Sequence, residues 1–124
     1  KKSAEKKEQP AVSGEMPAHV NAAYTFLLAW GKGNWDAAKA VAAETVTLKV
    51  GDKQYTLDVA GGKAEAMLVL PFKGISSLRE SGKVKGVTVE ELALKVGGTE
   101  KRGKGTLTLQ KNNGQFLVSG LTVE

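Results

Sequence analysis

The spacing of hydrophobic residues changes along the chain and divides it into a helical first part and a strand-forming remainder. Residues 16–30 carry apolar side chains at helical intervals, which predicts an amphipathic helix with one apolar stripe of Val20, Ala23, Tyr24, Leu27 and Leu28. Gly31 and Gly33 are expected to end this helix, and Gly31 is the candidate for its left-handed closing residue. Asn34 predicts the N-cap of a second helix over residues 35–42, so the two helices form a hairpin.

Strict alternation of apolar and polar residues follows and predicts two short antiparallel strands over 45–50 and 55–59. A loop of two or four residues keeps the apolar side chains on one face, and the expected pairs are Val50 with Tyr55, Leu48 with Leu57 and Val46 with Val59. Residues 64–70 fit either a short helix or a buried strand. Their length and their Ala-Glu-Ala-Met stretch favour the helix, which Pro71 would end. Residues 72–80 are ambiguous, and one interpretation is a further helical turn.

The last third of the chain, from Val84 onward, has the alternation of long strands. The parity of its apolar residues changes at Glu90-Glu91, which indicates a β-bulge that bends the sheet. Asn113-Gly114 predicts a two-residue hairpin turn. On one face this turn pairs Leu109 with Val118 and Lys111 with Phe116, and on the other it pairs Thr108 with Ser119 and Thr106 with Leu121. The second face is therefore expected to be half polar and half apolar.

Length and composition fit one folded domain. The chain has 124 residues, of which 41% are hydrophobic and 25% are charged, as in ordinary globular proteins. The absence of Cys and the presence of one His exclude disulfides, thiolate chemistry and a zinc site of several histidines within the chain. The element order predicts an α+β domain whose antiparallel sheet wraps the helices because the bulge bends it.

Residues 1–15 differ in composition from the rest, because they are polar, charged and contain Pro10. We expect a flexible polar tether there and a single domain over 16–124. The first residue is Lys rather than Met, which favours a protein that has lost a secretion signal or a lipid-bearing cysteine. We therefore predict an exported protein, periplasmic or lipid-anchored in a bacterial envelope, with a cytoplasmic location as the alternative. The sequence has no apolar run long enough to span a membrane as a helix.

The formal net charge of +5 raises the question of nucleic-acid binding. The densest basic stretch lies between Lys73 and Lys104, but few aromatic residues are interleaved with its lysines, as a base-stacking surface would need. We predict no specific nucleic-acid partner. Binding through Lys83, Lys85 and residues 101–104 is the competing hypothesis, and it would require salt-dependent retention on heparin or RNA.

Two segments of the chain resemble the NTF2-like (SnoaL-like) α+β cone superfamily, in particular its small bacterial envelope members. The first is AAYTFLLAW at residues 22–30 followed by GNWDAA at 33–38, where a helix ends in a glycine turn and the next helix opens. The second is the hairpin that joins LTL at 107–109 to GQFLVSG at 114–120. The resemblance implies a cystatin-like cone in which N-terminal helices pack in the concave face of a strongly curved antiparallel sheet.

The resemblance also implies a pocket inside the cone, in which some members transform small apolar substrates and others only bind ligands or partners. We cannot match a catalytic set here: His19 is expected at the surface or at an edge, and Glu90 and Glu91 are expected in solvent. We therefore predict no catalytic residue, no metal ligand and no cofactor. The candidate pocket residues are aromatic, with core packing as the alternative role: Tyr24, Trp30, Tyr55, Phe72 and Phe116.

These observations together predict a noncatalytic ligand-binding or protein-interaction domain, with a small apolar ligand as a candidate partner. The alternative is a small-molecule enzyme of the isomerase, dehydratase or cyclase kind that uses the cone pocket. The half-apolar sheet face with Leu117 and Leu121 predicts a homodimer formed through the sheet.

Overall fold

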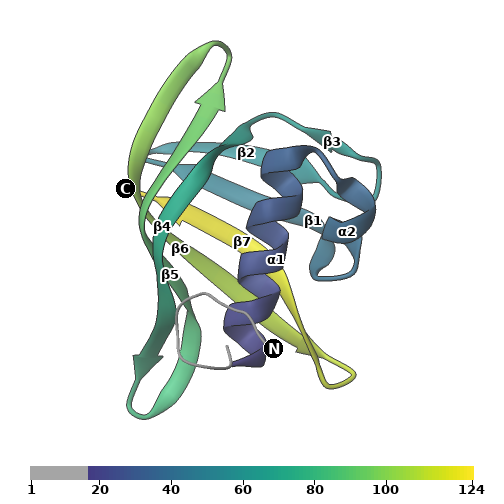
Figure 1. Cartoon of the computed structure of the whole chain (residues 1–124), viewed down its shortest axis with the longest axis vertical. Helices are drawn as coiled ribbons and strands as arrows, with labels where there is room; N and C mark the ends of the chain where they lie inside the picture. The colour runs from purple at the N-terminus through teal and green to yellow at the C-terminus, as the bar shows by residue number, and fades with distance from the viewer. Residues whose placement is uncertain (1–16) are drawn as a thin grey trace.

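The computed structural model describes residues 17–124, and the tether predicted for 1–15 lies outside them (Figure 1). Two helices come first and seven strands follow. Their bounds are α1 Ala18–Lys32, α2 Trp35–Lys39, β1 Ala42–Val50, β2 Lys53–Asp58, β3 Lys63–Ala64, β4 Met67–Glu80, β5 Lys83–Val96, β6 Thr99–Asn112 and β7 Gln115–Val123.

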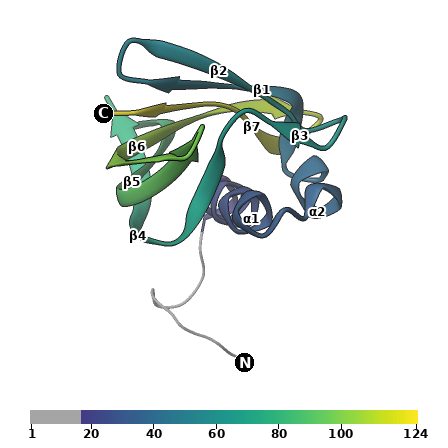
Figure 2. The ribbon, with the colours of Figure 1, turned by 90° about the horizontal axis from the view of Figure 1, so that it is seen from above.

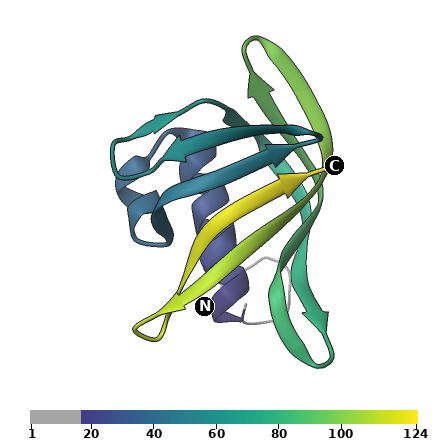
Figure 3. The same ribbon diagram turned by 180° about the vertical axis from the view of Figure 1, so that it is seen from behind.

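The strands form one mixed sheet in the order β3-β2-β1-β7-β6-β5-β4. Neighbouring strands are antiparallel except for β1 and β7, which are parallel. The last strand of the chain therefore lies in the middle of the sheet, as the view from behind shows (Figure 3). Seen from above, the sheet curls around α1 (Figure 2). The predicted α+β class and the curved, mainly antiparallel sheet that packs on the helices are confirmed.

Helix α1 packs against the concave face of the sheet, and its buried apolar stripe is wider than the one predicted. Phe26, Leu27 and Trp30 are completely buried, whereas Tyr24 and Leu28 are only half-buried. The indole Nε1 of Trp30 donates a hydrogen bond to the carbonyl oxygen of Ala66 at 3.0 Å, so its polar atom is satisfied inside the core. This bond ties α1 to the segment that leads into β4.

The helix ends at the predicted pair of glycines, but the prediction that Gly31 is the left-handed closing residue was wrong. The left-handed residue is Gly33, with φ of 73°, and its N–H bonds to the carbonyl oxygens of Ala29 and Trp30. Gly31 remains helical and lies against Leu70 of β4, where a Cβ atom would stand 2.6 Å from the Leu70 Cγ. Because Gly31 has no side chain, α1 can approach β4 closely at this point.

Helix α2 begins as predicted and ends earlier. The Asn34 side chain accepts a hydrogen bond from the Ala37 N–H at 3.2 Å, which confirms the N-cap. The helix stops at Lys39 because Ala42 already pairs with Val118 of β7. Sheet pairing, which local sequence does not show, therefore shortens the helix predicted over 35–42.

The hairpin of β1 and β2 keeps the predicted parity but is shifted by two residues. Leu48 lies opposite Tyr55, and Val50 lies opposite Lys53 across a two-residue turn. The predicted pairs assumed a four-residue loop. As a consequence, Lys53 shares the inward face with Tyr55 and Leu57.

The predicted bulge in β5 is confirmed. Val89 pairs with Gly105 and Leu92 with Gly103, so Glu90 and Glu91 together oppose a single residue, Lys104. Both glutamates are exposed, whereas Val89 and Leu92 on either side of them are buried. The extra residue therefore lets both halves of β5 direct apolar side chains at α1.

The helix expected over 64–70, with a stop at Pro71, was wrong. Ala64 ends β3, residues 65–66 form a bend, and the long strand β4 begins at Met67 and continues through Pro71 and residues 72–80. Pro71 is tolerated because β4 is an edge strand, where a backbone donor can be absent. The pairing of β4 shifts between Val69 and Lys73, beside the β5 bulge, and this interruption breaks the alternation that identifies a strand.

The hairpin of β6 and β7 turns at Asn113-Gly114 as predicted, and the pairs of Leu109 with Val118 and Lys111 with Phe116 are confirmed. Beyond them the register shifts by one residue, so that Leu121 pairs with Leu107 and not with Thr106. Leu121 is therefore 2% exposed and belongs to the core. The expectation that it lies with Leu117 on the outer face was wrong, and the predicted homodimer loses that support.

Deletion of Glu91 tests the importance of the bulge. Without the extra residue, Leu92 and Leu94 would turn outward, and loss of their burial is expected to lower the free energy of unfolding by at least about 4 kcal/mol. Urea denaturation followed by circular dichroism measures the change. Glu91→Ala keeps the residue count and is the control, expected within about 0.5 kcal/mol of the parent. Equal stability of the deletion and the control would contradict the role of the bulge.

Candidate ligand-binding cavity

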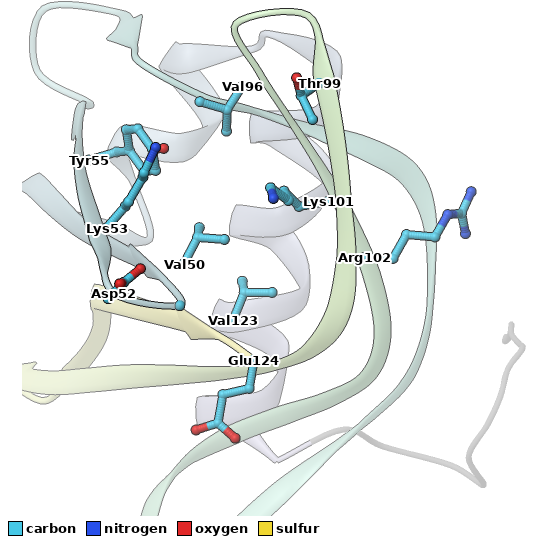
Figure 4. A pocket seen from close by; sticks show the side chains of 11 residues that line it. Val50, Asp52, Lys53, Tyr55, Val96, Thr99, Lys101, Arg102, Val123 and Glu124 are labelled. Carbon is cyan, nitrogen blue, oxygen red and sulfur yellow. The ribbon is translucent and has the colours of Figure 1, made fainter.

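A cavity of about 530 Å³ lies on the concave side, where the β1–β2 turn, the β5–β6 hairpin and the end of β7 meet (Figure 4). We call it the mouth cavity. Its apolar walls are formed by Val50 of β1, Tyr55 of β2, Val96 of β5 and Val123 of β7. The space between α1 and the middle of the sheet is filled by core side chains, among them Phe26, Leu27 and Trp30. The cavity is therefore at the end of the core and not at its centre.

Each apolar wall residue continues the core along its own strand. Val50, Val96 and Val123 come two residues after a buried leucine, and Tyr55 comes two residues before one; these leucines are Leu48, Leu94, Leu121 and Leu57. Residues two apart in a strand face the same side of the sheet, so the side chains of the wall point to the same side as the core leucines. Val50, Tyr55 and Val96 remain half-buried because no further layer of the described chain covers them. The mouth cavity is an uncovered extension of the apolar interior.

Two lysines face the same side as this apolar wall. Lys53 pairs with Val50, and Lys101 pairs with the buried Leu94, so both side chains leave the sheet on its concave side. Figure 4 shows Lys101 reaching into the cavity from β6 and Lys53 lying next to Tyr55. Among residues 17–124, neither lysine has an ion pair or a hydrogen bond from its side chain. The cavity thus presents ammonium groups above an apolar floor.

The other charged residues at the cavity are directed differently. Arg102 points away from it and pairs with Glu100 at 2.9 Å (Figure 4). Glu124 also points away, and Asp52 is an exposed residue of the β1–β2 turn. Within the described chain, no cluster of three His, Asp or Glu side chains is placed to hold a metal ion. The arrangement can hold the apolar part of a ligand and offer ammonium and phenol donors to a polar part of the same ligand.

Comparison with known proteins gives the fold. No protein-family model and no curated protein matches the sequence. An NTF2-like protein of unknown function from Cytophaga hutchinsonii has a similar structure, with a TM-score of 0.56 at 16% identity over 90% of this chain and 93% of that one. The chain has an NTF2-like fold. The predicted resemblance is thus confirmed at the level of the fold.

Two further solved structures are similar to this chain. An LEH-like epoxide hydrolase from M. tuberculosis matches with a TM-score of 0.53 at 15% identity, over 89% of this chain and 83% of that one. A protein of unknown function with a cystatin-like fold from Nostoc punctiforme matches with a TM-score of 0.52 at 14% identity, over 86% and 87% of the two chains. At such low identities the structural similarity shows a shared fold only. The activity has to be inferred from the side chains of the site.

The aromatic residues predicted for the pocket of the cone lie in separate places. Tyr55 lines the mouth cavity. Tyr24 and Phe72 pack edge to face, with ring centroids 5.5 Å apart, where α1 meets β4. Trp30 is in the core, and Phe116 lies near the start of β7, beside His19. The structure therefore brings Tyr24 and Phe72 together and separates the others.

The NTF2-like cone has site residues that the sequence pattern did not reveal. Val50, Val96 and Val123 were part of a predicted apolar face, with no sign that this face would remain open. Lys53 and Lys101 carried a usable signal, because a lysine at the apolar parity of a strand is unusual. That signal required the correct hairpin registers, and the predicted β1–β2 register left Lys53 in a loop.

The expectation that His19 lies at the surface or an edge was wrong, because it is 5% exposed. Its Nε2 atom is 2.6 Å from the Ser77 Oγ, and its ring contacts Phe116 edge to face at 5.8 Å. Burial lowers the pKa of His19, and the positive charge of Arg79 lowers it further. The imidazole is therefore neutral near pH 7 and holds the start of α1 against β4.

The pH dependence of stability tests this assignment. The pKa of unfolded His19 is about 6.5, and the folded pKa is lower, so the unfolded chain binds the proton more readily. Its contribution to stability is complete above about pH 6.5 and is lost as the pH falls below that value toward the folded pKa. Urea denaturation between about pH 7.5 and pH 5 measures this decrease. His19→Gln should be less pH-dependent over this range, and an equal dependence would contradict the assignment.

Neither of the helices within residues 17–124 is both long and apolar enough to cross a membrane.

Proposed function

We propose that this NTF2-like domain is a noncatalytic binding domain that holds a small, mainly apolar molecule in the mouth cavity. The observation that carries the proposal is the apolar wall, which continues the core along four strands and is left open. A volume of about 530 Å³ lies in the usual range for small-molecule sites. A ligand that covers Val50, Tyr55 and Val96 would remove from water the surface that the fold leaves exposed.

The inward side chains of the cavity favour binding over chemistry. They are aliphatic, ammonium or phenolic, whereas the carboxylates of Asp52 and Glu124 lie in an exposed turn and outside the cavity, respectively. An isomerase, dehydratase or cyclase would need an acid or base within an apolar pocket. At the mouth cavity that alternative depends on Tyr55, Lys53 and Lys101 as the acid or base. The epoxide hydrolase neighbour keeps the enzymatic alternative open through its fold alone.

Binding of N-phenyl-1-naphthylamine, a neutral dye that fluoresces in apolar surroundings, tests the proposal. The parent protein is expected to bind it. Val96→Trp should fill part of the cavity and weaken dye binding by about tenfold, since it removes contact area equivalent to about 1.4 kcal/mol. Fluorescence titration measures the affinity.

The matched control is Thr108→Trp, which adds the same side chain at an exposed position of β6 outside the cavity. It should bind the dye like the parent, and circular dichroism verifies that both variants are folded. No binding by the parent, or equal binding by the two variants, would refute the mouth cavity as the site.

Export to the bacterial envelope and homodimer formation remain predictions from the sequence. Export was inferred from residues 1–15, which lie outside the described chain. A dimer through the outer sheet face would have to form without Leu121, which is buried. Sedimentation velocity at increasing concentration distinguishes a monomer from a dimer.

A further inference from the structure

We infer that the mouth cavity selects small amphipathic anions, with an apolar body and one carboxylate, and that Lys101 recognises the negative charge. This inference deepens the proposed function and rests on it, because a cavity that binds nothing has no selectivity. It concerns the polar part of the ligand, about which the apolar wall says nothing.

The position of Lys101 on β6 supports this role. Lys101 pairs with Leu94 and has the inward parity of the strand, yet the next two inward positions toward the core are Gly103 and Gly105. The first inward side chain beyond them is Leu107, which is buried. Together with Thr99, which has the same parity, Lys101 forms the part of the cavity lining that β6 contributes from its inward face, and it carries a charge where a core strand would carry an apolar group.

The charged side chains that face the cavity are both cationic, which favours an anion, although Asp52 and Glu124 also belong to its lining. Lys53 and Lys101 enter from different sides of the cavity (Figure 4). Three other cations of the described chain have ion-pair partners: Lys39 pairs with Asp36, Arg102 with Glu100, and Lys104 with Glu90. Two like charges that face one partly apolar space repel each other, and a bound carboxylate would reverse that interaction.

A purely structural role for the two lysines makes a different prediction. Their aliphatic stems could cover the end of the core while the ammonium groups stay in water. Such lysines would increase the affinity for any apolar ligand equally, whatever its charge. Ligands that differ only in charge therefore separate the two roles.

The experiment compares decanoate, decan-1-ol and decylammonium, which share a chain length and differ in the head group. Binding is followed by NMR through the methyl signals of Val96 and Val123, below the concentrations at which the ligands aggregate. Decanoate is expected to bind roughly fivefold more tightly than decan-1-ol at low salt, and decylammonium more weakly than either. The preference for decanoate should disappear in about 0.5 M salt, where the charges are screened.

Lys101→Met keeps the length of the stem and removes the charge. It should remove the preference for decanoate over decan-1-ol, measured as the ratio of the two affinities within the same variant. Arg102→Met is the matched control, because Arg102 is the neighbouring residue, carries the same charge and points away from the cavity (Figure 4). The control should keep the preference for decanoate.

The outcomes separate the two proposals. If neither decanoate nor decan-1-ol perturbs the valine signals, the proposed function fails and the inference fails with it. If both bind equally to the parent, the cavity binds ligands but does not select anions, and only the inference is overturned. If Lys101→Met keeps the preference for decanoate, the assignment to Lys101 is wrong.

Discussion

The bend that crosses β4, β5 and β6 is the constraint on which the rest of the structure depends. In β5 two glutamates oppose one residue, and in β4 the pairing shifts beside them between Val69 and Lys73. In β6 the residue at the bend is Gly105, where an added Cβ would collide with the Leu92 side chain. A sheet bent along this line can surround a single helix, and Trp30 fixes that helix by its buried hydrogen bond to Ala66.

The same bend produces the mouth cavity. Beyond the bulge, β5 carries Leu92, Leu94 and Val96 on the parity opposite to that of Val87 and Val89. This change of parity keeps the far half of β5 facing the concave side, and the paired part of β6 follows it. The β5–β6 hairpin thereby stands across from the β1–β2 turn, and the apolar wall is left between them (Figures 1 and 4). One irregularity in the strands serves both packing and the candidate site.

The function proposed here comes from the side chains and not from the fold. NTF2-like neighbours include an epoxide hydrolase and proteins of unknown function, so the architecture alone accommodates both catalysis and other roles. In this chain the cavity has valines, a tyrosine and inward lysines, and its carboxylates are exposed or point away. This arrangement suits recognition of an apolar body with a negative end.

The sequence by itself determined the features that depend on neighbouring residues: helix α1, the Asn34 cap, the bulge at Glu90-Glu91 and the turn at Asn113-Gly114. Capping, bulge parity and turn preference act within a few residues, so the local pattern contains them. Only the tertiary structure decided that 67–80 is strand, that β1 runs parallel to β7, and that Lys53 and Lys101 share a cavity. These outcomes depend on pairing between distant segments, where burial against α1 and the register of neighbouring strands outweigh local preference.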